Sequence, residues 1–519
     1  MILSQLDQKS KSQDNQKIKE LDDLADILDS HRNRGEKIVL CHGVFDLLHV
    51  GHIYHFEEAK KMGDVLVVTI TPDHHVNKGP HRPAFPQALR AQVIAALGVV
   101  DYVAINQWPT AIDTVKLLKP HVYAKGPDYQ DASKDVTGNI ALEAEAVQLA
   151  GGEIRCTQGV TFSTSNLLNR HWSLFPPETS TFLEAFRKRY SLQDIRQNLD
   201  SLRSLKVLVI GETILDEYVY GDTIGKSAKE PVLAMRYISK DIHAGGVLAI
   251  ANHIADFCDD VKVVSYLGKI NPREEFVRAQ LKDNVKPDFI YKADSPTIVK
   301  RRYVEKYTVS KLLEIYEMND ELLNEEEDRQ FCDLLEKRLD QCDVAIVADY
   351  GHGFISPRAA EILSAKAKFL AVNTQINAAN IGFHTISKYR RADYVCIHEG
   401  EIRLDYRNRK EDLKKLTTDL VSRLDCQLVM VTLGKRGTLL HHATQGFSHC
   451  PAFADKVIDR IGAGDSVLAL TSLCAARDLP PDVTGFVGNL AAAQAVMIVG
   501  NKSSISRVQL FKSIESMLK

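Results

Sequence analysis

The sequence predicts an α/β protein of two domains, and three observations support that fold class. Short apolar runs typical of buried strands alternate with amphipathic helical segments along the chain. A chain of 519 residues is too long for one hydrophobic core, so two or three domains are expected. Two separate glycine-containing motifs, at residues 42–52 and 459–466, each open a helix. We therefore expect one α/β domain around each motif.

The composition restricts the kind of protein. Hydrophobic residues make up 45% and charged residues 26%, as in globular proteins, and a net charge of −3 argues against a broad nucleic-acid surface. No apolar run approaches a bilayer's thickness, and the polar N-terminus has no signal-peptide core, so no membrane association is expected. The nine cysteines include no C-x-x-C pair, which favours reduced thiols and a cytoplasmic protein.

The first motif joins a strand to a helix. Ile38–Cys41 is an apolar, β-branched run that indicates a buried strand, and Gly43 breaks it. His49 and His52 are three residues apart where the helix should begin, so both imidazoles should lie on one side of its first turn. Gly51 between them lets a ligand approach the backbone, and the free N–H groups of a helix start attract phosphate. This pattern predicts a phosphate-handling site.

The segments around this motif predict a parallel sheet. Residues 1–34 form a polar segment and a helix, and Val65–Ile70 is a second buried strand. The strand–helix–strand order implies a right-handed crossover between parallel strands. Such sheets bind ligands at the carboxyl ends of their strands, where His49 and the loop of residues 71–82 fall.

The string HGVFDLLHVGH, residues 42–52, contains the H-x-G-H signature of the nucleotidyltransferase superfamily and resembles its cytidylyltransferase-like branch. Residues 35–170 resemble the adenylyltransferase half of the ADP-heptose synthases, which are bifunctional heptose kinase/adenylyltransferases, and also glycerol-3-phosphate cytidylyltransferases. The resemblance implies a Rossmann-like nucleotidyltransferase domain over 35–170. In such a domain a phosphorylated substrate attacks the α-phosphate of ATP or CTP and pyrophosphate leaves; the choice of nucleotide stays open.

The same resemblance implies roles for individual residues. His49, His52 and Lys78 would be catalytic, with Lys78 and Mg²⁺ holding the β- and γ-phosphates. Arg82 would bind the substrate. The implied nucleotide-binding residues are Gly43, Phe45, Asp46, Gly51, Lys125, Gly126, Asp128, Ser163 and Thr164. The chain departs from the family at His42, where asparagine or tyrosine is usual.

The alternation of strands and helices restarts in the second half of the chain. Residues 171–204 are predicted to be a linker with a helical part, and residues 205–519 a second α/β domain. Near its end, Asp459–Ser466 opens an apolar helix. Small glycines there leave N–H groups free to hold phosphate oxygens, and Asp465 just after them can take the proton of an attacking hydroxyl.

This D-x-x-G-A-G-D string is the second signature of the ribokinase-like (PfkB) sugar kinases, and residues 205 to about 508 resemble that family. The resemblance implies an ATP-dependent carbohydrate kinase domain with Asp465 as general base and Glu401 linked to Mg²⁺. The implied nucleotide-binding and anion-hole residues are Thr432, Gly434, Gly437, Gly462, Ala463 and Gly464. The implied sugar-side residues are Asp216, Gly245, Gly246 and Lys300.

Two functional interpretations remain open. In the first, the chain is a bifunctional, self-associating enzyme that makes an activated nucleotide-sugar or nucleotide-polyol from sugar or polyol phosphates. In the second, only the transferase works, and the kinase-like half is a sugar-phosphate-binding or assembly module. The second is motivated by Ala249, Asn373 and His398, which depart from the kinase pattern. The halves also stand in the reverse order to those of the ADP-heptose synthases.

Overall fold

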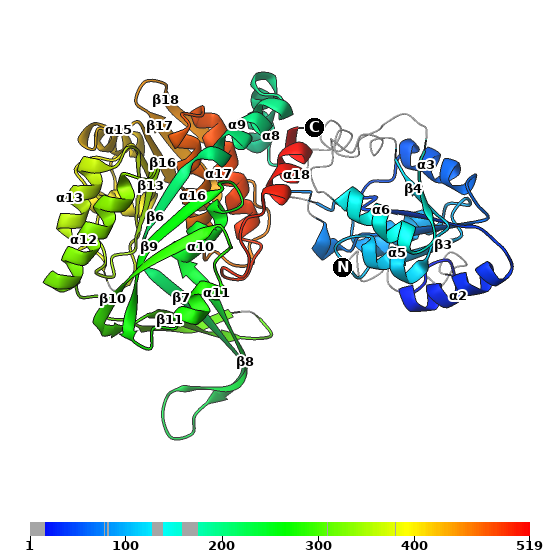
Figure 1. Cartoon of the computed structure of the whole chain (residues 1–519), viewed down its shortest axis with the longest axis horizontal. Helices are drawn as coiled ribbons and strands as arrows, with labels where there is room; N and C mark the ends of the chain where they lie inside the picture. Colours follow the sequence, from blue (N-terminus) through cyan, green and yellow to red (C-terminus); the bar gives the residue numbers. More distant parts are fainter. Residues whose placement is uncertain are drawn as a thin grey trace. The chain divides into compact units, whose positions relative to one another are not determined.

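The computed structural model describes residues 16–76, 78–79, 82–126, 139–157, 175–308, 310–378 and 380–518. The chain divides into two compact units (Figure 1): the first is Met1–Ser180 with Phe511–Lys519, and the second is Thr181–Leu510. The predicted linker contains helices α8 (Pro177–Arg189) and α9 (Leu192–Ser201). The last residues of the chain, which the sequence assigned to the second domain, thus group with the first unit.

The first unit is built on a five-stranded parallel sheet in the order β3-β2-β1-β4-β5. The strands are β1 (Ile38–Gly43), β2 (Val65–Ile70), β3 (Tyr102–Ile105), β4 (Val122–Lys125) and β5 (Glu153–Cys156). The helices are α2 (Leu21–Asn33), α3 (Val50–Lys60), η2 (Asp73–His75), α4 (Gln87–Ala95), α5 (Ile112–Leu118) and α6 (Asn139–Leu149). The strand order reverses between β1 and β4, so their carboxyl ends form the topological switch point where such sheets bind ligands.

The alternation of side chains along β1 builds a core on each face of this sheet. Val39 and Cys41 pack in one cluster with Phe56 of α3 and Ile94 of α4. Ile38 and Leu40 face the opposite cluster, which contains apolar residues of α2 and α5. All four strand residues are buried, because each face of the parallel sheet is covered by helices.

The second unit contains two sheets. The nine-stranded sheet has the order β10-β9-β6-β13-β14-β15-β16-β17-β18, and its neighbouring strands are parallel except that β17 pairs antiparallel with both β16 and β18. The smaller sheet has the order β12-β11-β7-β8. The strands of the larger sheet are β6 (Lys206–Gly211), β9 (Asp260–Ile270), β10 (Val285–Pro296), β13 (Val344–Asp349), β14 (Leu370–Thr374), β15 (Tyr394–His398), β16 (Leu428–Thr432), β17 (Thr438–His442) and β18 (Gly446–Cys450). Those of the smaller sheet are β7 (Thr213–Lys226), β8 (Leu233–Gly246), β11 (Ile298–Glu305) and β12 (Ser310–Glu317). The smaller sheet was not anticipated from the sequence.

Helices cover both faces of the larger sheet (Figure 1). The remaining helices of the chain are α10 (Val247–Ile254), α11 (Glu274–Ala279), α12 (Glu325–Leu339), α13 (Pro357–Lys366), α14 (Glu399–Asp405), α15 (Leu413–Arg423), α16 (Ala463–Ala476), α17 (Pro481–Ala495) and α18 (Arg507–Leu518). The short turns are η5 (Leu202–Ser204), η6 (Ile386–Lys388) and η7 (Gly434–Arg436). Helix α16 is buried continuously from Ser466 to Ala475 and packs against β13 and β15. Its apolar sequence therefore belongs to a central helix whose N-terminus carries the second motif.

Candidate active sites

The first helix start is organised by its two histidines. His49 is the N-cap of α3, and its Nδ1 accepts a hydrogen bond from the backbone N–H of Gly51 at 3.1 Å. The rings of His49 and His52 stack with centroids 3.9 Å apart. The structure thus confirms that the three-residue spacing puts both imidazoles on one side of the turn.

Both imidazoles are held in their neutral form. Burial, together with the neighbouring charges of His49 and Lys78, lowers the pKa of His52 to about 3, and burial and Lys78 lower the pKa of His49. Among the described residues, the buried Nδ1 of His52 has no hydrogen-bond partner. A neutral imidazole can donate one N–H to a phosphate oxygen without bringing a charge of its own. The pair therefore suits a site that receives an anion.

Phe45 shapes the wall next to these histidines. It has a positive φ of 47°, and its ring meets His52 edge-on at 5.3 Å and Phe56 at 5.1 Å. A Cβ at Gly43 would lie 2.9 Å from this ring, so only glycine leaves room for the ring there. Gly43 and Phe45, both predicted to bind the nucleotide, are thus matched to each other at the carboxyl end of β1.

Two predicted binding residues are paired with each other. The Nη1 of Arg82 lies 3.3 Å from Oδ2 of Asp46, and the side chains are only 3% and 1% exposed. Oδ1 of Asp46 accepts the backbone N–H of Phe85 at 3.1 Å. Burial lowers the pKa of Arg82, while the carboxylate of Asp46 opposes that shift. The pair ties the loop before α4 to the loop after β1, which limits how far either side chain can reach a ligand.

The lysine–glycine segment lies at the switch point. Lys125 ends β4, its Nζ is 2.6 Å from Oε2 of Glu143, and it lies over the ring of Tyr123 at 4.5 Å. Gly126 follows with open space where a Cβ would stand. Lys78 is partly buried and acts on both histidines through its charge. The other predicted residues of this site, Asp128, Ser163 and Thr164, lie outside the described residues.

His42, which departs from the family pattern, has a structural role in connecting two strand ends. Its Nδ1 is 2.9 Å from Oγ1 of Thr69 and its Nε2 is 3.3 Å from Oγ1 of Thr71. Burial, with a contribution from Lys125, lowers its pKa to about 3. Because both ring nitrogens are bonded to threonines of β2 and the residue after it, His42 fixes the spacing of two adjacent strand ends.

The second helix start carries a carboxylate. Gly462 is the N-cap of α16 with a φ of 81°, and Asp465 stands in the first turn. The hydroxyl of Tyr350 donates to Oδ1 of Asp465 at 2.9 Å. Burial raises the pKa of Asp465 to about 6; Asp216 adds to that rise, and Tyr350 and Lys300 oppose it. A carboxylate with this pKa can accept a proton near neutral pH.

The predicted sugar-side residues gather near this carboxylate. Asp216 of β7 bonds to Arg302 and accepts from Nδ2 of Asn501 at 3.0 Å. A Cβ at Gly245 would lie 2.1 Å from Oδ2 of Asp216, and one at Gly246 would meet the carbonyl of Glu212 at 2.5 Å. Both glycines are therefore required by close packing.

Lys300 completes this group of predicted sugar-side residues. Its Nζ lies 5.1 Å from the ring centre of Tyr316 and 5.9 Å from that of Tyr350. Burial lowers its pKa, and the carboxylate of Asp216 opposes that shift. Since Asp216 and Lys300 both influence the pKa of Asp465, the structure brings the predicted base and the predicted sugar-side residues together.

The predicted nucleotide turn follows β16. Thr432 ends that strand and pairs in register with His398 of β15. Gly434 and Gly437 both have positive φ, and a Cβ at Gly437 would lie 2.0 Å from the carbonyl of Cys450. The turn and the segment containing Glu401 thus lie at neighbouring strand ends.

Glu401 was predicted to act on Mg²⁺. Its Oε1 accepts the N–H of Ile376 at 3.1 Å and its Oε2 the N–H of His398 at 2.7 Å. Burial raises its pKa to about 7 against these two hydrogen bonds. Among the described residues, no three His, Cys, Asp or Glu side chains form a metal cluster. This donor set fits Mg²⁺ only where nucleotide phosphates and water supply most of its ligands.

Several residues of the second site escaped sequence reasoning. Asn501 links Asp216 to the glycine loop, since a Cβ at Gly462 would lie 2.2 Å from its Oδ1. Tyr218 of β7 and Lys311 of β12 donate hydrogen bonds at 3.0 Å and 2.6 Å to Asp459, the first residue of the second motif. Tyr350 could have been suspected, because it directly follows a strand end; no sequence signal marks Asn501.

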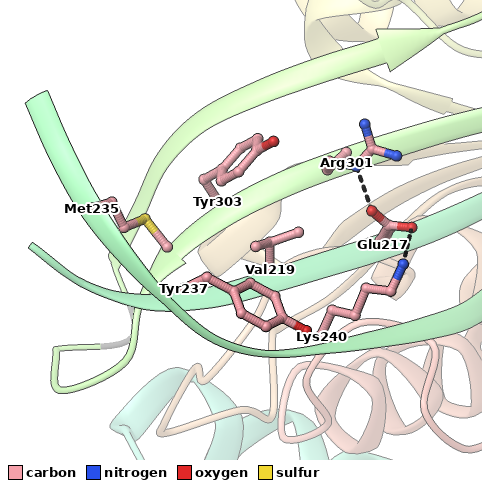
Figure 2. A pocket seen from close by; sticks show the side chains of 7 residues that line it. All are labelled: Glu217, Val219, Met235, Tyr237, Lys240, Arg301 and Tyr303. Carbon is pink, nitrogen blue, oxygen red and sulfur yellow. Dashed lines mark hydrogen bonds and ion pairs between the residues drawn. The ribbon is translucent and has the colours of Figure 1, made fainter. Parts of the chain in front are cut away.

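A hollow in the second unit lies on the other face of the smaller sheet. Its volume is about 340 Å³, and Figure 2 shows its lining residues: Glu217, Val219, Met235, Tyr237, Lys240, Arg301 and Tyr303. Glu217 is ion-paired with Arg301 and, at 3.7 Å, with Lys240. Asp216 and Tyr218, the alternate residues of β7, point instead to Asn501 and Asp459. This hollow is therefore separate from Asp465.

Two further expectations concern the whole chain. All nine cysteines are free thiols, and all except Cys156 are buried. In the part of the chain that the structure describes, no helix is both long enough and apolar enough to cross a membrane.

Comparison with known proteins agrees with this arrangement. Residues 40–213 match the cytidylyltransferase-like family and residues 204–506 the pfkB family carbohydrate kinases. The bifunctional protein HldE of Geobacter metallireducens is 40% identical over 159 residues, which are 30% of this chain and 31% of that protein. The HldE of Shewanella sediminis is 27% identical over 324 residues, 62% of this chain and 66% of that protein. The chain thus spans about a third of the length of the first of these relatives.

A solved structure supports the fold of the second unit. Phosphofructokinase-2 from Escherichia coli, in complex with substrates and products, superposes with a TM-score of 0.50 at 16% sequence identity. The match covers 61% of this chain and all of that one. Because the pfkB match spans more than half of its residues, the chain belongs to the pfkB family of carbohydrate kinases, with a cytidylyltransferase-like domain preceding the kinase domain.

Proposed function

We propose that the chain is a bifunctional enzyme that makes an activated nucleotide-sugar or nucleotide-polyol. The kinase domain phosphorylates a sugar or sugar phosphate with ATP, and the cytidylyltransferase-like domain moves a nucleotidyl group from ATP or CTP to a sugar or polyol phosphate. The observation that carries this proposal is the pair of helix starts: stacked neutral histidines on α3 and a carboxylate behind a glycine turn on α16.

In the kinase step, the acceptor hydroxyl gives its proton to Asp465 as its oxygen bonds to the γ-phosphorus of ATP. The bond between that phosphorus and the bridging oxygen breaks, and its electron pair leaves with ADP. The N–H groups at Gly462–Gly464 would hold phosphate oxygens at the helix start. A pKa of about 6 leaves Asp465 mostly ionised at neutral pH and able to accept the proton.

In the transferase step, an oxygen of the sugar phosphate bonds to the α-phosphorus of the nucleotide. The bond to the β-phosphate breaks, and pyrophosphate leaves with the electron pair. The attacking oxygen is already ionised, so no base is needed, and His49 and His52 donate N–H groups to oxygens that gain charge. Mg²⁺ bound with the nucleotide would neutralise phosphate charge in both steps, and Glu401 is the residue we propose to act on it in the kinase.

Two screens test this proposal. Pyrophosphate release is measured for four nucleoside triphosphates against a panel of sugar and polyol phosphates, including heptose 1-phosphates and glycerol 3-phosphate. ADP release is measured with ATP against the same panel and heptose 7-phosphate. We expect one productive combination in each screen, and the His49→Ala/His52→Ala variant should lose pyrophosphate release while keeping ADP release. Activity of that variant equal to the wild type would contradict the transferase site.

The alternative, a kinase-like domain that only binds or assembles, is favoured by one observation. Asn373, which departs from the kinase pattern, donates its Nδ2 to the carbonyl of Cys396 at 2.7 Å and so serves the framework between β14 and β15. Under this alternative, Asp465→Asn leaves the overall activity unchanged. Under the bifunctional proposal, it lowers ADP release by about 10²- to 10⁴-fold.

A further inference from the structure

The hydroxyl of Tyr350 forms a hydrogen bond directly to the side chain of Asp465, the proposed base. Tyr350 follows β13, is only 3% exposed, and donates to Oδ1 of Asp465 at 2.9 Å. The two residues are 115 positions apart in the chain, so the contact is made by the packing of α16 against β13. The buried hydroxyl of Tyr350 is therefore hydrogen-bonded to the carboxylate that acts as the base in the proposed kinase reaction.

Tyr350 is itself held from several sides. Its backbone N–H donates to Oε2 of Glu212 at 3.1 Å, and its carbonyl accepts from Nδ2 of Asn377 at 2.8 Å and Nδ2 of Asn380 at 2.9 Å. The ammonium of Lys300 lies 5.9 Å from its ring centre. With its backbone bonded at both ends, the phenol is preorganised toward Asp465.

We propose that Tyr350 is a positioning residue for the kinase base: its hydroxyl occupies Oδ1 of Asp465, stabilises the ionised carboxylate and leaves Oδ2 to take the acceptor proton. This inference rests on the proposed function, in which Asp465 is the base. It adds a residue to the kinase site that the D-x-x-G-A-G-D motif does not contain.

The groups around Asp465 determine in which direction its pKa should change when the Tyr350 hydroxyl is removed. Burial and Asp216 of β7 raise the pKa of Asp465, whereas the hydrogen bond from Tyr350 and the charge of Lys300 on β11 lower it, with a result of about 6. Removing the Tyr350 hydroxyl deletes one of the two opposing contributions. The pKa of Asp465 should then rise by about one unit, which corresponds to about 1.4 kcal/mol.

The test is a titration of Asp465 in the full-length protein labelled with ¹³C at the aspartate side-chain carboxyl. The resonance missing from Asp465→Asn identifies the group. We expect Tyr350→Phe to move its midpoint up by about one pH unit. The matched control is Tyr394→Phe, which removes a buried hydroxyl bonded to the neutral Thr471 at 2.7 Å in the same unit and should leave the midpoint unchanged. A Tyr350→Phe midpoint equal to the wild type, or below it, would overturn the inference.

Placing 3-fluorotyrosine at position 350 keeps the inference testable if Tyr350→Phe folds poorly. The fluorinated phenol is more acidic and donates a stronger hydrogen bond, so the midpoint of Asp465 should move down. No shift in that direction would again contradict the inference.

Kinetics separate this inference from the proposed function. The acidic limb of the kinase pH–rate profile should move up with the NMR midpoint in Tyr350→Phe, with most of the rate recovered on the alkaline plateau. A uniform loss at every pH with an unmoved limb would mean a merely structural role for Tyr350. Undiminished ADP release by Asp465→Asn would instead refute the base assignment, whatever Tyr350→Phe does.

Discussion

The starts of α3 and α16 are proposed to bind the same kind of ligand, but they carry different chemical groups. The first turn of α3 contains no acidic residue and is lined by neutral imidazoles, one of which caps the helix. The first turn of α16 contains Asp465 and is capped by a glycine in the left-handed region. Both starts offer free backbone N–H groups to an anion. They differ in whether a group is present that can remove a proton.

That difference follows the nucleophile that each domain is proposed to use. A phosphate oxygen is already ionised, so a nucleotidyltransferase needs donors around the reacting phosphate and no base. A sugar hydroxyl keeps its proton at neutral pH, so a kinase needs an acceptor beside it. Under the proposed function, the residue types at the two helix starts match the protonation state of the attacking group.

The largest expected effect is the separation of the two activities. Asp465→Asn should lower kinase turnover by about 10²- to 10⁴-fold, the usual contribution of a general base, and leave pyrophosphate release unchanged. The measurement is ADP release and pyrophosphate release on the same preparation. A similar loss of both activities would show that the two helix starts do not serve separate reactions.

A pair of glycine variants tests whether the start of α16, at Gly462–Gly464, binds phosphate oxygens. In Gly462→Ala, the left-handed φ costs about 1–2 kcal/mol and the new methyl would stand 2.2 Å from Oδ1 of Asn501, so both the unfolding temperature and the kinase rate should fall. In Gly464→Ala nothing lies within 4 Å of the new methyl, so stability should be kept. If Gly464→Ala lowers the ADP-release rate and leaves the unfolding temperature unchanged, that result would support phosphate binding next to Gly464. Unchanged rate and temperature would contradict it.

The two activities should also differ in their dependence on pH. Asp465 must be ionised to act, and burial raises its pKa to about 6, so the kinase rate should fall about tenfold for each pH unit well below 6. Burial holds the pKa of His52 at about 3, so its protonation should produce no limb in pyrophosphate release between pH 5 and about 8. Parallel acidic limbs near pH 6 in both profiles would contradict this contrast.

The smallest expected effect concerns the residue before the glycine turn. Asp459 accepts hydrogen bonds from Tyr218, Lys311 and two backbone N–H groups, whereas the start of α3 is capped by its own histidine. The side chain of Lys311 is 39% exposed, so Lys311→Met should cost no more than about 1 kcal/mol of unfolding free energy. Lys306→Met, at an exposed lysine near the same sheet, is the matched control and should cost less.

The effect of Lys311→Met should disappear in acid. Burial alone would raise the pKa of Asp459, but the hydrogen bonds from Lys311 and the backbone outweigh it and the pKa is lowered. A lowered carboxyl pKa contributes stability above the ordinary pKa of about 3.9, and that contribution is lost as pH falls through the lowered value. Thermal unfolding at neutral and acidic pH measures this, and a variant difference independent of pH would contradict the ion pair.

Local patterns were sufficient to find both helix starts. The three-residue spacing of His49 and His52 is a property of one helical turn, so their position on one side of that turn could be predicted without a partner segment. The glycines before Asp465 likewise act within a few residues. Other predicted binding residues proved to have framework contacts that no local pattern reveals. Arg82 and Asp46, for example, form a buried pair across 36 positions.

The sequence by itself therefore determined the α/β class, the presence of two units and the chemical character of each helix start, because these depend on periodicity and on neighbours within one turn. Only the tertiary structure decided that Tyr350 meets Asp465, that Asn501 meets Asp216 and that residues 511–519 group with the first unit. Such contacts join positions 115 and 285 residues apart. They depend on how helices and strands pack in three dimensions, which patterns within a few residues of the sequence do not predict.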